Sequence, residues 1–91
     1  MKTRNEIIKD LEDRLFLLKF IAVDEIDADE RFGQISAVES CIEKHKKDWT
    51  LEQFKKHLKD NEKENEYGDY IDGFMSVLRR NIKDMEGLEN E

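Results

Sequence analysis

Apolar side chains recur at helical spacing from the start of the chain. The first predicted helix is capped by Thr3, and Glu6 stands three residues on, where a capping box places a glutamate. This helix is expected to extend to about Ile26. Its main stripe consists of Ile8, Leu11, Leu15, Leu18 and Ala22.

The segment LFLLKFIAV, residues 15–23, is apolar in almost every direction around this first helix, and only Lys19 interrupts it. Such a segment needs cover on more than one side. The second and fourth helices of the same chain are predicted to cover one side. A second copy of the chain is predicted to cover the other side, through Phe16, Phe20 and Val23.

The second predicted helix starts within the sequence DADE, with Asp27 or Asp29 as its cap, and ends at HKKD. Its apolar face carries Phe32, Ile35, Val38 and Ile42. A neighbouring flank carries the small residues Gly33, Ser36, Ala37 and Ser40. We interpret this flank, with equal weight, as a place of close helix approach or as an ordinary helix side.

The third predicted helix begins at Leu51, after the best-specified turn in the chain. Thr50 and Gln53 form a capping box, and Trp49 and Phe54 occupy the two positions of a hydrophobic staple. The single tryptophan is therefore interpreted as structural. Apolar positions stop in the sequence KDNEKENE, and a glycine at position 68 is expected to terminate the helix.

The fourth predicted helix starts between Asp69 and Asp72. Its apolar face consists of Tyr70, Ile71, Phe74, Val77, Leu78, Ile82 and Met85. The chain has no proline, only four glycines and no runs of β-branched residues, so strands are not expected. The pattern predicts an all-α fold: a small up-down bundle of about four helices, with a single helical domain over residues 1–88 and a disordered tail over 89–91.

Charge and composition narrow the classes of partner. A net charge of −7 argues against direct binding to nucleic acid or to an anionic membrane. No apolar run approaches the roughly 20 residues that span a bilayer, and the start of the chain lacks the apolar run of a signal peptide. Cys41 is the only cysteine, so an internal disulfide is excluded and a cytoplasmic location is expected.

The sequence predicts neither an enzyme nor a cofactor or metal site. No nucleophile elbow, phosphate-binding glycine loop or zinc-protease helix is present. Cys41 and His45 stand four residues apart, with His57 on the next helix, but a confident zinc site needs four ligands, so a structural role is preferred. Two acidic segments fail the EF-hand pattern at its glycine and glutamate positions.

Acidic residues cluster in two of the three connections. Five lie within residues 24–30, and six more lie within residues 60–72 against a single lysine. In an up-down bundle these connections share one end. Helix capping explains some of these acids but not Asp24, Glu25 or the run NEKENE, for which a solvated loop is the simpler interpretation.

Two functions from different classes follow. The first is a non-enzymatic interaction or assembly module that forms a homodimer through its first helix. The second is an acidic inhibitor, mimicking nucleic acid, that presents its negative end to a basic protein. The residue usage, rich in Lys, Glu, Asn and Ile, resembles that of a short reading frame from an AT-rich bacterium or its phage. The residues expected to meet such a partner are Asp24, Glu25, Glu62, Glu64 and Glu66.

Overall fold

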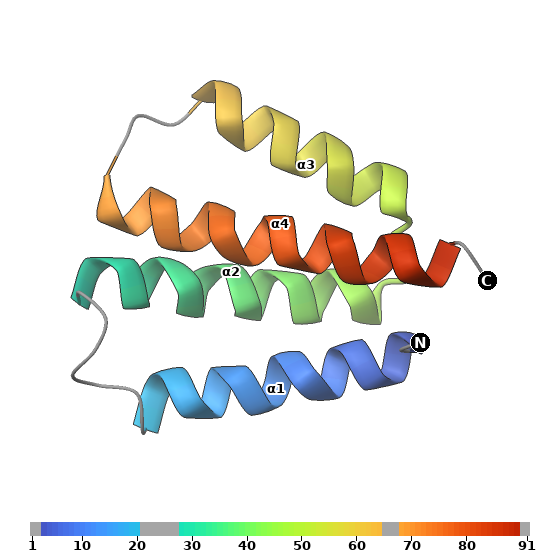
Figure 1. Cartoon of the computed structure of the whole chain (residues 1–91), viewed down its shortest axis with the longest axis horizontal. Helices are drawn as coiled ribbons and strands as arrows, with labels where there is room; N and C mark the ends of the chain where they lie inside the picture. Colours follow the sequence, from blue (N-terminus) through green and yellow to red (C-terminus); the bar gives the residue numbers. More distant parts are fainter. Residues whose placement is uncertain (1–2, 21–27, 65–67, 90–91) are drawn as a thin grey trace.

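The computed structural model describes residues 3–20, 28–64 and 68–89, and these residues form four α-helices without a strand (Figure 1). The all-α prediction is thereby confirmed. The helices are α1 (Arg4–Phe20), α2 (Ala28–Lys46), α3 (Leu51–Glu64) and α4 (Asp69–Glu89).

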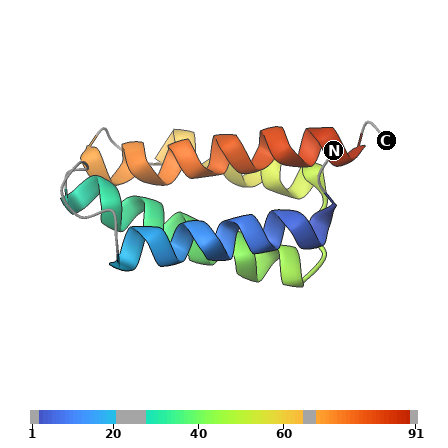
Figure 2. The ribbon, with the colours of Figure 1, turned by 60° about the horizontal axis from the view of Figure 1, so that its bottom comes forward.

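The helices lie side by side in the spatial order α1, α2, α4, α3 (Figure 1). Consecutive helices are antiparallel, as predicted. The central pair, α2 and α4, are not consecutive in the chain and therefore run in the same direction (Figure 1). The molecule measures 37 × 30 × 19 Å, and all four helices run roughly along its long dimension (Figure 2). The chain therefore forms a flattened helical bundle, in which α1 and α3 occupy opposite flanks.

Two glycines explain why α2 and α4 pack together so closely. A Cβ atom at Gly33 would overlap the carbonyl oxygen of Tyr70, and one at Gly73 would overlap the carbonyl oxygen of Glu30. The two backbones are thus in direct contact near the helix N-termini, which only glycine permits. Of the two interpretations of the small-residue flank of α2, the structure therefore supports close helix approach.

The buried face of α2 is consequently rotated from the predicted one. Phe32 was expected on the apolar face, but its side chain is 54% exposed. Ile35 and Ile42 are only partly buried. The buried residues of this helix are Gly33, Gln34, Ala37, Val38, Cys41 and His45.

Both predicted capping boxes form. The backbone N–H of Glu6 donates to Thr3 Oγ1 at 3.2 Å, and that of Gln53 donates to Thr50 Oγ1 at the same distance. In the second box the side chain of Gln53 also accepts from the Thr50 N–H at 2.8 Å. The Trp49 and Phe54 rings lie 5.4 Å apart between centroids, which confirms the staple and the structural interpretation of the tryptophan.

A Schellman motif ends α2. The N–H of Trp49 donates to the carbonyl of Lys44, and the N–H of Asp48 donates to the carbonyl of His45. Asp48 takes the left-handed conformation that this motif requires, with φ of 60°. The motif turns the chain sharply, so that α3 begins beside the end of α2 and runs back along α4.

The core contains residues from all four helices. On α1 the inward stripe starts at Ile7, which is fully buried, rather than at Ile8, and on α4 the predicted core residue Tyr70 is 42% exposed. Within the described residues α1 ends at Phe20, so its predicted extension to Ile26 lies outside them. The buried hydrophobic residues are Ile7, Leu11, Leu18, Ala37, Val38, Cys41, Leu51, Phe54, Met75, Val77, Leu78, Ile82 and Met85.

At the C-terminal end, α4 continues through its last glycine to Glu89, the first residue of the predicted tail. None of the helices within residues 3–20, 28–64 and 68–89 combines the length and apolarity needed to cross a bilayer.

Candidate functional site

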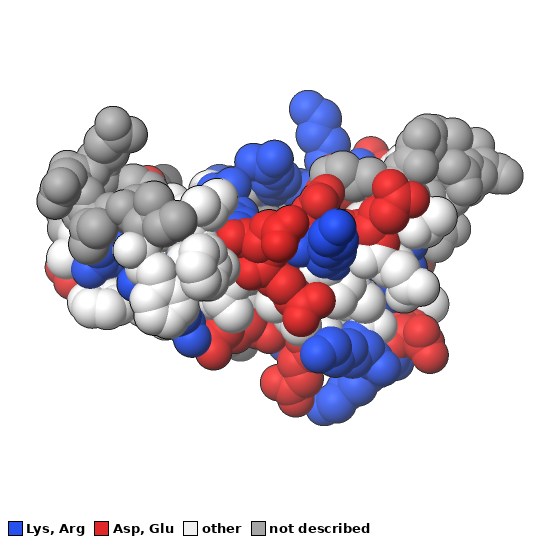
Figure 3. All heavy atoms as spheres, turned by 90° about the horizontal axis from the view of Figure 1, so that it is seen from below, with Lys and Arg blue, Asp and Glu red and all other residues white. Residues whose placement is uncertain are grey.

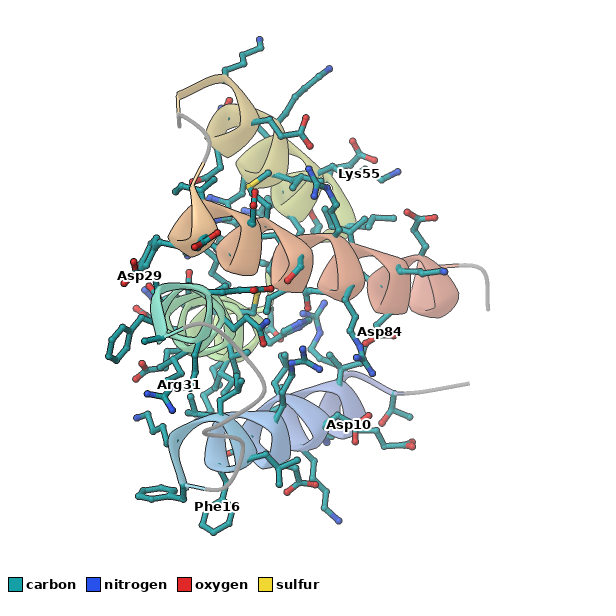
Figure 4. All side chains as sticks on the ribbon, turned by 60° about the vertical axis from the view of Figure 1, so that its left-hand side comes forward. Asp10, Phe16, Asp29, Arg31, Lys55 and Asp84 are labelled. Atoms are coloured by element: carbon teal, nitrogen blue, oxygen red, sulfur yellow. The ribbon has the colours of Figure 1, made fainter. Side chains whose placement is uncertain are left out.

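The outer face of α1 exposes two adjacent phenyl rings. The side chains of Phe16 and Phe20 are 56% and 68% exposed, and their ring centroids lie 5.1 Å apart. Phe16 points away from the other helices (Figure 4). Because Ile7, Leu11 and Leu18 of the same helix are buried in the core, α1 is apolar both on its inner and on its outer face.

A groove of about 630 Å³ runs beside these rings, between α1 and α2. Its apolar lining comes from Leu15 and Ile42 together with the two rings. Charged residues of both signs form the remaining lining, and Lys19 Nζ lies 3.7 Å from a carboxylate oxygen of Glu39 across the groove. Acidic and basic side chains are likewise interspersed with uncharged ones over the α1 side of the molecule (Figure 3). The charged lining residues are Glu12, Lys19, Glu39, Glu43 and Lys46.

The structure places three of the residues predicted to meet a partner. Phe16 and Phe20 are exposed, as the self-association hypothesis requires. Glu62 lies on α3 with its carboxylate 3.9 Å from the guanidinium of Arg79 on α4, so its charge is partly offset within the chain. The remaining predicted residues, Val23, Asp24, Glu25 and Glu66 and the side chain of Glu64, lie outside the described part of the structure.

The acidic helix ends gather at one end of the molecule. The N-termini of α2 and α4 lie there side by side, joined by the glycine contacts (Figure 1). Asp29 marks this end in Figure 4. The acidic residues in the first turns of the two helices are Asp29, Glu30, Asp69 and Asp72.

A buried polar network at the opposite end was not foreseen from the sequence. Arg4 on α1 donates to the backbone carbonyl of Trp49 at 3.0 Å and lies 3.3 Å from Nδ1 of His45. Nε2 of His45 lies 2.6 Å from Oδ1 of Asn81 on α4. Since a guanidinium can only donate, Nδ1 is the acceptor, and Nε2 carries the proton that His45 donates to Asn81.

Two of the residues considered as zinc ligands, Cys41 and His45, are buried. Burial lowers the pKa of His45, although the hydrogen bond to Asn81 opposes this shift. Burial raises the pKa of the Cys41 thiol to about 12, so the thiol stays protonated in the core. No three His, Cys, Asp or Glu side chains within the described ranges are placed to hold one metal ion.

The position of Asn81 in the sequence is the signal that could have revealed this network. Asn81 stands three and four residues after Leu78 and Val77 and four before Met85, on the apolar face of α4. A polar residue at such a position is expected to be buried with a partner, because an unpaired buried amide is costly.

No protein-family model, curated protein or solved structure matches this chain. Its function is therefore argued from its own surface and interior. Two features stand out among the described residues: the exposed rings of α1 with their groove, and a second groove between α1 and α4.

Proposed function

We propose that this protein is a small non-enzymatic assembly module that forms a homodimer through the outer face of α1. The observation that carries the proposal is the pair of contacting phenyl rings, Phe16 and Phe20, exposed beside an apolar groove. Burial of one such side chain stabilises by roughly 1.5–3 kcal/mol, and a two-fold interface counts each ring twice.

The charges around the groove favour a second copy of this chain as the partner. The lining carries three glutamates and two lysines. Because charges of both signs are present, the groove does not favour a partner with a strong charge of one sign. In a two-fold interface each lysine of one copy can face a glutamate of the other. An apolar centre surrounded by polar residues is also the usual composition of such interfaces.

The test compares the parent chain with one double variant and one single variant, by light scattering over a range of concentrations around micromolar. Phe16→Ser with Phe20→Ser should give a species of 10.9 kDa, whereas the parent chain gives twice that mass. Phe32→Ser is the matched control, since Phe32 is 54% exposed on α2 and does not line the groove. A parent chain that remains monomeric at all concentrations would contradict the proposal.

A second candidate function is an acidic inhibitor of a basic protein. It is supported by the adjacent N-termini of α2 and α4, which place the acidic first turns of both helices at one end. A surface that carries charges of one sign accelerates association with an oppositely charged partner. Neutralising the acidic residues separates this candidate from the dimer, because it should remove salt-sensitive capture of a basic protein without changing self-association.

A further inference from the structure

A second groove, of about 380 Å³, lies between α1 and α4, away from the exposed rings. Its apolar lining comes from Ile7, Leu11 and Val77, which are buried, and from Leu17 of α1, which is 47% exposed. Asp10 lies on α1 and Asp84 on the side of α4 that faces α1 (Figure 4). The polar residues that line the groove are Asp10, Asp13, Arg14, Arg80, Asn81 and Asp84.

Arg14 occupies a position on the inward stripe of α1. It stands three residues after Leu11 and four before Leu18, where an apolar residue would continue the core. One terminal nitrogen of its guanidinium donates to Oε1 of Gln34 at 3.4 Å, while its Nε–H is buried without a hydrogen-bond partner. Burial, with the nearby charge of Arg80, lowers the pKa of Arg14.

Asn81 supplies a second unused donor to the same groove. Its side chain is 2% exposed, and its Oδ1 is engaged by the protonated Nε2 of His45. That contact fixes the amide orientation and leaves the Nδ2 group buried without a partner. A buried donor left unsatisfied destabilises the fold, so two beside one groove indicate a ligand that accepts hydrogen bonds.

We propose that this groove binds a small monocarboxylate with an apolar body. The carboxylate accepts hydrogen bonds from Arg14 Nε and Asn81 Nδ2, and the apolar body lies against Leu11 and Leu17. A guanidinium and an amide are suited to a carboxylate because both offer directed N–H donors.

The acidic residues around the groove select the charge of the ligand. The unpartnered buried atoms of the groove, Arg14 Nε and Asn81 Nδ2, are donors, and Asp10 and Asp84 each have an interaction of their own. Together with Asp13, these residues set three carboxylates against the guanidiniums of Arg14 and Arg80. A dianion such as phosphate would be repelled, whereas a single carboxylate meets the two donors at a smaller electrostatic cost.

The first experiment measures binding of benzoate to the full chain by calorimetry and by amide chemical shifts. Benzoate should bind saturably and shift residues of α1 and α4 around the groove. Benzyl alcohol, which keeps the ring but not the charge, should bind about tenfold more weakly or worse, and inorganic phosphate should not bind. Absence of saturable benzoate binding would overturn the proposal and indicate that water alone satisfies the two donors.

Variants then locate the site. Arg14→Lys keeps the charge but removes the Nε–H donor, and Asn81→Asp replaces the amide donor by an oxygen, so each should weaken benzoate binding about tenfold. Arg79→Gln is the matched control, because Arg79 pairs with Glu62 on the α3 side. Thermal melting checks that each variant is folded, and Arg14→Lys decides the outcome if Asn81→Asp does not fold. Binding by Arg14→Lys equal to that of the parent would overturn the proposal.

Discussion

At the residue scale, the described interior of this small protein contains polar side chains as well as hydrophobic ones. Gln34, His45 and Asn81 are buried among the core hydrophobics, and Arg14 extends the inward stripe of α1. Arg4, His45 and Asn81 join α1, α2 and α4 through directed hydrogen bonds. Because these bonds need one protonation state of His45, they make the fold sensitive to pH.

We expect the stability to fall as the pH is lowered, through His45. Burial holds the pKa of folded His45 below its ordinary value of 6.5, so below that pH the unfolded chain binds more protons than the folded chain. The contribution is fully present above pH 6.5 and is lost as the pH falls through the lowered pKa. Urea denaturation at about pH 5 and about pH 7.5 measures it.

His45→Gln is the comparison for this measurement, since glutamine does not titrate. The variant should lose less free energy of unfolding between the two pH values than the parent chain does. Burial also lowers the pKa of His57, so part of the loss remains in the variant. An equal loss in both proteins would assign the pH dependence to His57 or to carboxylates instead.

At the element scale, the contact between α2 and α4 depends on the absence of side chains at two positions. Gly33→Ala should destabilise the protein by about 1–3 kcal/mol or more, because the new Cβ would overlap the backbone of α4. Gly87→Ala is the matched control: nothing lies within 4 Å of the added atom, and alanine favours the helix by up to about 1 kcal/mol.

Thermal or urea unfolding of the two glycine variants checks this prediction. The two substitutions add the same methyl group to helices of the same protein, so helix propensity alone would stabilise both. Opposite signs of the change therefore isolate the close approach of the helices. A Gly33→Ala variant as stable as the parent would show that α2 and α4 can separate without loss.

At the scale of the whole molecule, the order of the helices places the acidic first turns of α2 and α4 at one end and both phenyl rings on one flank. The acidic-inhibitor candidate predicts that replacement of its five carboxylates by their amides removes salt-sensitive capture of a basic protein while the fold stays intact. Stability should be unchanged or improved, because like charges no longer repel at one end. The replaced residues are Asp24, Glu25, Glu62, Glu64 and Glu66.

The measurement is capture of basic proteins from lysate at low and moderate salt, together with melting temperature and light scattering. Screening acts over about 8–10 Å at physiological ionic strength, so capture by the parent chain should decline with salt. Capture that survives the replacement would reject the inhibitor. Dimer formation should be unaffected in this variant, since the proposed interface rests on the rings of Phe16 and Phe20, which the variant keeps.

The sequence alone determined where helices begin and which side chains cap them. Thr3 with Glu6, Thr50 with Gln53 and the Trp49 staple act over three to five residues, so their geometry depends on neighbours in the chain and the structure confirms them. Exposure of Phe16 and Phe20 was also predictable, because α1 carries more apolar surface than one neighbouring layer of helices can cover.

Only the tertiary structure decided which helix faces meet. Periodicity favoured the large side chains of α2, including Phe32, but Gly33 and Ala37 form the buried face because two backbones approach there. It also decided that Arg14 and Asn81 line one groove, since they stand 67 positions apart in the sequence. Local patterns encode what a residue does to its own helix, whereas such contacts depend on how distant surfaces fit together, which the spacing of apolar residues does not specify.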